Sequence, residues 1–120
     1  MNKLSEQYRG KVDFYAVYIV EAHPTDLWQM RSNVREGVLF RNPKSDAERV
    51  NVANACWRKL GIKFPALVDS IDNKVEAAYT GWPDRLYLID RGGKVVYKSK
   101  PGPFGFDPNA LAKAMHELLP

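Results

Sequence analysis

Apolar residues form an almost unbroken run at residues 12–20, "VDFYAVYIV", and most of them are β-branched or aromatic. In an extended chain both faces of this run would be apolar, which predicts an interior strand, with parallel neighbours. Shorter runs at residues 64–69, "FPALVD", and 85–89, "RLYLI", also predict strands. Residues 94–98, "KVVYK", follow a glycine turn and predict a strand that forms a hairpin with the one before it.

Helical signals occupy the segments between these runs. The clearest helix is expected at residues 45–60, where Ser45 and Glu48 can form a capping box and Gly61 can end the helix. Its expected buried stripe is Val50, Ala53, Cys56 or Trp57, and Leu60. Shorter helices are expected at residues 2–9, ended by Gly10, and at residues 73–79. The last helix is expected after Asp107 and Pro108, with a buried stripe of Leu111, Met115, Leu118 and Leu119.

Residues 21–44 are less regular, with a short helical turn expected near residues 26–32 and an extended piece at residues 37–40. The whole order alternates strands and helices and finishes with a hairpin and a helix. This order predicts a three-layer α/β domain with a mixed sheet, spanning residues 1–120 as a single domain. The final pattern of proline turn, strand, glycine turn, strand and helix resembles the end of thioredoxin-like domains.

Composition narrows the class of protein. The 18 Lys and Arg residues are scattered among 14 Asp and Glu, which argues against a nucleic-acid partner. No apolar run is long enough to cross a membrane, and the N-terminus lacks the apolar core of a signal peptide, so a cytoplasmic location is expected. The single cysteine, Cys56, excludes an intrachain disulfide and a cysteine-rich metal site.

Three polar residues follow the first strand directly: Glu21, His23 and Asp26. Ligands of α/β sheets bind beyond the carboxyl ends of strands, and a histidine beside a carboxylate can transfer protons near neutral pH. The group could therefore be catalytic, or it could be a polar loop in which Asp26 caps a helical turn. A metal site is not expected, because a third strong ligand is not evident.

Other chemically active side chains are less well placed. Cys56 lies in the middle of a helix, where a buried, unreactive thiol is expected. Pro83 precedes a buried strand, and its peptide bond could be cis or could form a rigid trans turn; the sequence does not separate the two. Arg85 could pair with Asp84 or with an acidic ligand, and the structural pair is the expected one. His116 lies off the apolar stripe of the last helix and is expected to be exposed.

The segment "FYAVYIVEAHPTDLW", residues 14–28, resembles the hallmark of the iodothyronine deiodinase family, in which a strand leads into Glu-Ala-His-x-Ser/Thr-Asp-x-Trp. Residues 83–108 resemble that family's Pro-Glu-Arg-Leu-Tyr strand, glycine hairpin and Gly-Pro loop. Residues 64–79 resemble its strand ending in Asp and the helix that follows. The resemblance covers residues 11–119.

The resemblance implies a thioredoxin-like fold related to peroxiredoxins, and reductive removal of iodine by a selenocysteine or cysteine. It implies that His23 contacts the substrate or relays a proton, with Glu21 as its acidic neighbour. Asp26 and Trp28 would shape the loop, Pro83 would face the nucleophile, and Arg85 would help to shape the site. No cofactor is implied beyond a thiol reductant as co-substrate, and the partner would be a small-molecule substrate of the full-length form.

The chain departs from this family at one decisive point. The family's nucleophile lies on a strand and helix that precede the segment matching residues 11–20, and this strand–helix unit is missing here. We expect this chain by itself to be inactive, and upstream DNA with an in-frame UGA codon would explain the missing unit.

The missing strand would lie between the strands at residues 12–20 and 85–89. Its loss leaves two options within one molecule, direct pairing of these strands or rearrangement of the sheet. A third option is a second copy that fills the gap, and exposed sheet edges favour a homodimer. The functional alternatives to a deiodinase-like oxidoreductase are a non-enzymatic interaction domain and a relative of thiol peroxidases.

Overall fold

The computed structural model describes residues 1–21 and 43–120. The expectations for the helical turn near residues 26–32 and the extended piece at 37–40 lie outside the described residues, as do His23, Asp26 and Trp28. Within the described residues, eight elements follow one another: α1 (Asn2–Gln7), β1 (Ala16–Tyr18), α3 (Asp46–Leu60), β2 (Ala66–Val68), α4 (Lys74–Tyr79), β3 (Tyr87–Ile89), β4 (Val95–Lys98) and α5 (Pro108–Leu118). This mixture confirms the expected α/β class.

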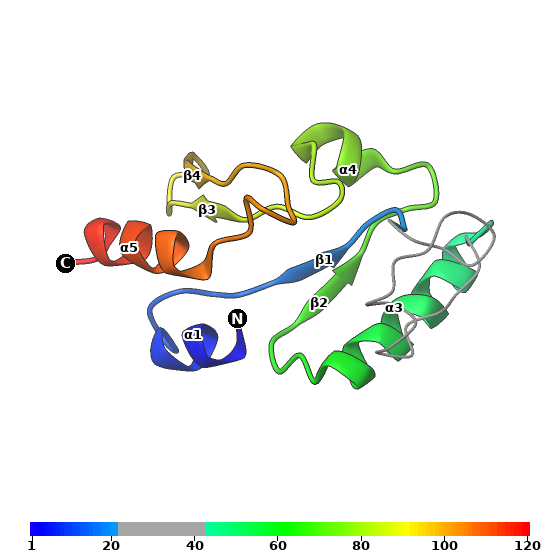
Figure 1. Cartoon of the computed structure of the whole chain (residues 1–120), viewed down its shortest axis with the longest axis horizontal. Coiled ribbons are helices and arrows are strands. Elements are labelled where there is room, and N and C mark those ends of the chain that lie inside the picture. The colour runs from blue at the N-terminus through cyan, green and yellow to red at the C-terminus, as the bar shows by residue number, and fades with distance from the viewer. Residues whose placement is uncertain (22–42) are drawn as a thin grey trace.

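The described strands form two separate pairs instead of one mixed sheet. β1 and β2 are parallel, with Val17 opposite Leu67, whereas β3 and β4 are antiparallel, with Leu88 opposite Tyr97. Figure 1 shows β1, β2 and α3 at one end of the molecule, and the β3–β4 hairpin with α5 at the other. Direct pairing of the first strand with the third, one option from the sequence, is therefore not what the fold adopts.

The expectation that residues 12–20 form an interior strand is wrong for the described chain. Only Ala16–Tyr18 is a strand, and its hydrogen-bonded neighbour is β2 alone. Apolar side chains on both faces favour a strand whose two faces are covered, but they do not by themselves supply a neighbour along each edge. The described residues, however, supply a partner for one edge only.

Helix α3 begins and ends where the sequence predicts. Ser45 Oγ accepts a hydrogen bond from the amide of Glu48 (3.2 Å), and Gly61 ends the helix in the left-handed conformation at φ 64°. The second half of the capping box differs, because Glu48 Oε2 accepts from the amide of Lys44 (2.7 Å) and not from that of Ser45.

The buried stripe of α3 is rotated from its expected position. Ala53 and Cys56 are buried as predicted, but Val50 and Leu60 are exposed, and Arg49 is buried in their place. Residues 49, 53 and 56 follow the i, i+4, i+7 spacing of one helix face. This face meets the β1–β2 sheet because Arg49 finds a hydrogen-bond acceptor there, as described below.

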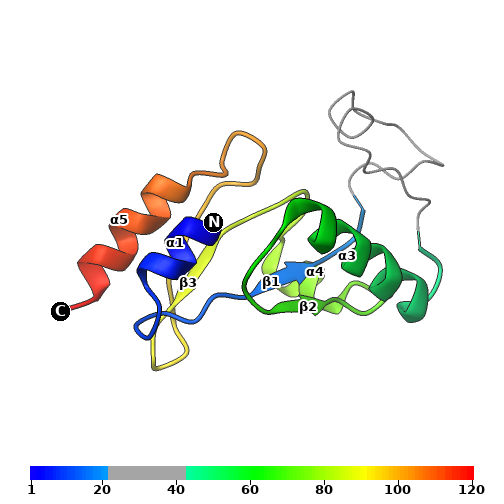
Figure 2. The same ribbon diagram turned by 90° about the horizontal axis from the view of Figure 1, so that it is seen from below.

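A second core lies at the other end of the molecule. Leu88 of β3 packs with Leu111 and Met115 of α5, and α1 contributes side chains around them. The turned view in Figure 2 also places α1 beside α5 and β3. Leu111 and Met115 confirm the expected stripe of α5, whereas Leu118 is 43% exposed, because it lies at the border of an open cleft.

The cleft separates the two pairs of strands and has a volume of about 1560 Å³. It is bordered by residues from both sides, among them Val17 and Ile19 of the β1 segment, and Tyr87 and Ile89 of β3. The space between β1 and β3, where a strand is expected to be missing, is thus open among the described residues. The expected homodimer stays a prediction.

None of the helices in the described ranges combines the length and apolarity that a membrane crossing requires.

Candidate active site

Glu21 lies just beyond the carboxyl end of β1, and its side chain is partly buried. The hydroxyl of Tyr18, the last residue of β1, donates a hydrogen bond to Glu21 Oε2. The other oxygen, Oε1, is buried and has no hydrogen-bond partner within the described part of the chain. One carboxylate oxygen is therefore held in place, and the other remains able to accept a proton or a hydrogen bond.

The surroundings of Glu21 act on the pKa of its carboxyl group in both directions. Burial raises the pKa of the carboxyl group, while the hydrogen bond from Tyr18 and the positive charge of Arg49 lower it by less, so the pKa is raised. The pKa of Tyr18 is raised strongly, first by burial and then by the contact with Glu21. Tyr18 therefore remains a neutral donor, and Glu21 is the group of this pair that can exchange a proton.

Cys56 and Trp57 of α3 lie close to Tyr18. The indole ring of Trp57 meets the Tyr18 ring edge-on, with centroids 6.0 Å apart. Cys56 is 7% exposed, and burial raises the pKa of its thiol. The burial of Cys56 is as expected from the sequence, and a raised pKa disfavours the thiolate that acts as a nucleophile.

Arg49 is the charged residue that sequence reasoning missed. Its side chain is 1% exposed, and one of its terminal nitrogens donates to the carbonyl of Ser70 (2.6 Å). Its Nε has no hydrogen-bond partner within the described residues. The spacing of Arg49 to Ala53 and Cys56 was a usable signal, because it places the arginine on the buried face of the helix.

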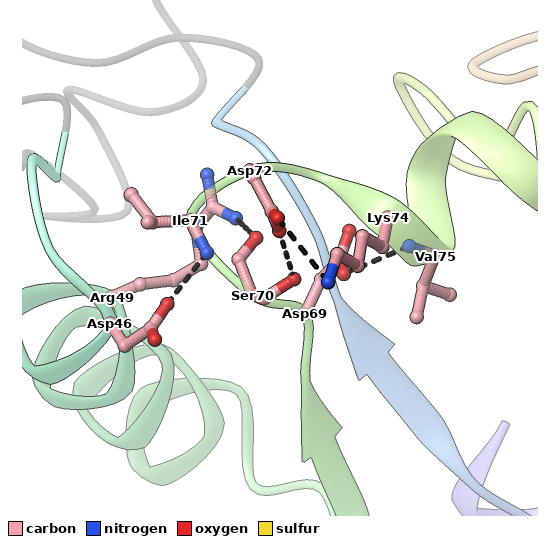
Figure 3. A network of polar contacts seen from close by, with 8 residues as sticks. All are labelled: Asp46, Arg49, Asp69, Ser70, Ile71, Asp72, Lys74 and Val75. Atoms are coloured by element: carbon pink, nitrogen blue, oxygen red, sulfur yellow. Dashed lines mark hydrogen bonds and ion pairs between the residues drawn. The ribbon is translucent and has the colours of Figure 1, made fainter.

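Figure 3 shows how this part of α3 is tied to the loop after β2. Arg49 reaches Ser70, and Asp46 Oδ1 accepts a hydrogen bond from the amide of Ile71 (2.6 Å). Asp69, 3% exposed, accepts from the amides of Val75 and Glu76 at the start of α4. The network fixes α3 and α4 relative to the sheet, and with them the position of Arg49 near Glu21.

The second part of the predicted site, Pro83 and Arg85, borders the cleft. The Trp82–Pro83 peptide bond is cis, which is one of the two alternatives that the sequence leaves open for this turn. Arg85 donates to Thr80 Oγ1 (2.8 Å) and forms no ion pair with Asp84 among the described residues, so the expected structural pair is wrong. Asp84 instead turns toward Gly102, with Oδ1 buried and unpartnered in this part of the chain, and burial raises the pKa of its carboxyl group.

Some of the remaining predicted residues lie in the described part of the chain, and others lie outside it. His116 is exposed, as expected. Glu21 is described, whereas His23, Asp26 and Trp28 are not, so whether they surround Glu21 stays a prediction. Over residues 1–21 and 43–120 no group of three metal-ligating side chains comes together.

Comparison with known proteins decides the family. The sequence model of the family described as iodothyronine deiodinase matches residues 1–118. The chain belongs to the iodothyronine deiodinase family. The type I iodothyronine deiodinase of Xenopus laevis is 29% identical over 97% of this chain, and the thyroxine 5-deiodinase of Gallus gallus is 34% identical over 91%. The human thyroxine 5-deiodinase is 32% identical, also over 91% of the chain.

The relatives are much longer than this deiodinase-family chain. The match covers 44% of the Xenopus protein, 40% of the chicken protein and 34% of the human protein. The Tyr18–Glu21 pair, Cys56 and the cis-proline turn all fall within the matched residues. The comparison therefore assigns a family to the region that contains the candidate site, but not an activity to the chain.

Proposed function

We propose that this domain provides the acid–base half of a deiodinase-like redox site. The observation that carries the proposal is the Tyr18–Glu21 pair at the carboxyl end of β1, in which Glu21 has a raised pKa and an unpartnered oxygen. The family match over residues 1–118 supports the reaction class. His23, two residues beyond Glu21, completes the proton-transfer group in this proposal.

The proposed reaction replaces a carbon–iodine bond by a carbon–hydrogen bond. Overall, the iodinated compound and two thiols give the deiodinated compound, one disulfide, one iodide ion and one proton. The thiols supply the two electrons, and the proton that the ring carbon gains comes from a protein acid. Glu21, whose pKa is raised by burial, is suited to hold this proton and to pass it to His23 or receive it from there.

The nucleophile of this reaction is not Cys56. Its thiol is buried within α3, and burial raises its pKa, so the reactive thiolate is disfavoured. We therefore propose that residues 1–120 alone do not remove iodine. A thiol or selenol outside these residues would act as the nucleophile.

The test compares two proteins in an iodide-release assay with thyroxine and excess dithiothreitol. Residues 1–120 should release no iodide above background, with or without Cys56→Ser. The longest natural gene product that contains these residues should release iodide. In that product, Glu21→Gln and His23→Ala should each lower the rate about 100-fold or more, the usual contribution of a general acid or base.

A matched control is Glu117→Gln, an exposed glutamate of α5, which should leave the rate unchanged. Normal rates in both the Glu21 and the His23 variants would refute the proton-transfer role. Turnover of hydrogen peroxide without iodide release would instead assign the protein to the thiol peroxidases. Iodide release by residues 1–120 that disappears in Cys56→Ser would show that the buried thiol is the nucleophile.

A further inference from the structure

Cationic and hydroxyl side chains gather on the face of the β3–β4 hairpin that is turned away from α5. Leu86 and Leu88 point toward the core around α5. Side chains alternate along an extended chain, so Arg85 and Tyr87 lie on the other face. Lys98 of β4 is directly opposite Tyr87 in the strand register, and residues in opposite positions share a face. This face therefore brings together two positive charges and a phenol.

These side chains converge on the hydroxyl of Tyr87. The ammonium group of Lys98 lies 5.7 Å from the centre of the Tyr87 ring. Arg85 donates a hydrogen bond to Thr80 Oγ1 (2.8 Å). Burial raises the pKa of Tyr87, but the contacts of its hydroxyl with these three side chains together lower it by more, so the pKa is lowered. Both cations are thus within reach of one point.

The two cations have no acidic partner. Over residues 1–21 and 43–120, neither Arg85 nor Lys98 forms an ion pair with a carboxylate. Nε of Arg85 is also buried and lacks a hydrogen-bond partner within these residues. A buried donor without a partner costs free energy, which a bound acceptor would recover. Two positive charges and an unused donor at one place favour a ligand with two negative charges.

The end of α4 is shaped around the same place. Thr80 adopts the left-handed conformation at φ 49°, which is rare for a β-branched residue, although Gly81 follows directly and could adopt it without strain. Such strain persists where the surrounding contacts hold it. Here the Thr80 hydroxyl accepts from Arg85 and donates to the carbonyl of Tyr79 (2.7 Å). The ring of Tyr79 in turn meets that of Tyr87 edge-on, with centroids 5.1 Å apart.

We propose that this face of the hairpin binds a doubly charged oxyanion of the phosphate type. The binding groups are the side chains of Thr80, Arg85, Tyr87 and Lys98. A guanidinium group holds such an oxyanion through two parallel hydrogen bonds, and the unused Nε of Arg85 supplies one of them. A phosphate ester carries about −1.5 to −2 charges at neutral pH, which matches the two cations. A single carboxylate would leave one cation unmatched.

The oxyanion could be free phosphate or the phosphate group of an ester. Ile89 lies two residues beyond Tyr87 on the same face and is 45% exposed, and Tyr79 is 40% exposed. The apolar part of an ester could therefore lie against these side chains. The proposal does not depend on the proton-transfer role of Glu21, which lies beyond β1 in the other pair of strands.

The experiment titrates residues 1–120 with phenyl phosphate and follows the backbone amides and the Nε signal of Arg85 by NMR. Saturable binding should shift the Nε signal, because this nitrogen gains a hydrogen-bond partner. Phenol is the matched control ligand, since it has the ring without the charge, and it should leave the Nε signal in place. Inorganic phosphate separates the two sources. Equal affinity would identify free phosphate as the ligand, and tighter binding of phenyl phosphate would identify an ester.

Three variants test the position. Arg85→Gln and Lys98→Gln should each weaken the binding of phenyl phosphate about 10-fold or more, the usual effect of losing a hydrogen bond to a charged group. Lys113→Gln is the control, because it removes the same charge from an exposed position of α5, on the other side of the hairpin. It should leave binding unchanged. Circular dichroism of the three variants checks that the fold is retained.

The comparison of phenyl phosphate with phenol on the unaltered chain decides the matter even if a variant fails to fold. Equal shifts of the Arg85 Nε signal with both ligands would overturn the proposal, because the ring alone would then account for binding. An Nε signal that stays in place at saturation would also overturn it. So would normal affinity for phenyl phosphate in both Arg85→Gln and Lys98→Gln.

Discussion

The hydroxyl of Tyr18 donates a hydrogen bond to Oε2 of Glu21, and this contact joins the last residue of β1 to the first polar residue beyond it. The two residues are three apart in sequence, so the contact is local. The burial that raises the pKa of both groups is not local, because Cys56 and Trp57 of the distant helix α3 lie close to Tyr18.

Replacing Tyr18 by phenylalanine tests the hydrogen bond alone, because the ring and its contact with Trp57 are kept. The hydrogen bond lowers the pKa of Glu21, so its loss should raise that pKa further. The free energy of unfolding should fall by about 0.5–1.5 kcal/mol, the usual net value of one hydrogen bond. Carbon-detected NMR titration of the Glu21 carboxyl and urea denaturation measure the two effects.

The control for this variant is Tyr15→Phe. Tyr15 is 60% exposed, so removal of its hydroxyl should change neither quantity. An unchanged titration of Glu21 in Tyr18→Phe would mean that the hydrogen bond does not form in solution.

Replacing Glu21 by glutamine tests the dependence of stability on pH. The pKa of Glu21 is higher in the folded protein than in the unfolded chain, so the folded state binds the proton more tightly. The resulting stability is fully present below the unfolded pKa and is lost as the pH rises through the folded pKa. Glutamine has no proton to lose, so the unfolding free energy of Glu21→Gln should rise relative to the unaltered chain over this window.

Urea denaturation at a series of pH values, from below the ordinary glutamate pKa to neutral, measures this difference. Glu117→Gln serves as the exposed control. It should not change the slope of the unfolding free energy against pH to a comparable extent. If the unfolding free energies of Glu21→Gln and the unaltered chain differed by the same amount at all pH values, this would contradict the raised pKa of Glu21.

Replacing Arg49 by methionine removes a buried charge but keeps most of the apolar volume. The carbonyl of Ser70 loses its donor, which should lower the free energy of unfolding by about 1–3 kcal/mol. The pKa of Glu21 should rise, because the positive charge that lowers it is gone. Urea denaturation and NMR titration of Glu21 measure both effects.

Arg58→Ala is the matched control on the exposed face of the same helix, and it should change stability by less than about 0.5 kcal/mol. If Arg49→Met left the Glu21 titration where it was, the two residues would not interact in solution.

Replacing Gly102 by alanine tests the position of Asp84 beside the Pro83 turn. A Cβ atom at residue 102 would overlap the Asp84 carboxylate, so that side chain must move. Burial is what raises the pKa of Asp84, and movement toward solvent should lower the pKa toward its ordinary value. NMR titration of the carboxyl measures the change.

Gly81→Ala is the control, because its Cβ would meet Ile19 at an ordinary contact distance of 3.4 Å. A raised pKa that persists in Gly102→Ala would show that Asp84 stays buried and that the loop around residue 102 moves instead.

The sequence by itself determined most of the local structure. Ser45 and Gly61 set the ends of α3, and Asp107 caps α5, accepting hydrogen bonds from the amides of Asn109 and Ala110. These features depend on contacts within a few residues, which the order of residue types fixes. The motif around Glu21 and His23 likewise identified the family, because it is a short contiguous pattern.

Only the tertiary structure decided which side chains meet. Arg49 is buried although arginine is rarely buried, because the carbonyl of Ser70, 21 residues away, lies within reach of its guanidinium group. Periodicity alone gave the stripe through Val50 and Leu60, since it cannot know where such an acceptor will be. In the same way, apolar residues on both faces predicted an interior strand, but only the fold showed that β1 pairs with β2 alone among the described strands and that Val17 borders an open cleft.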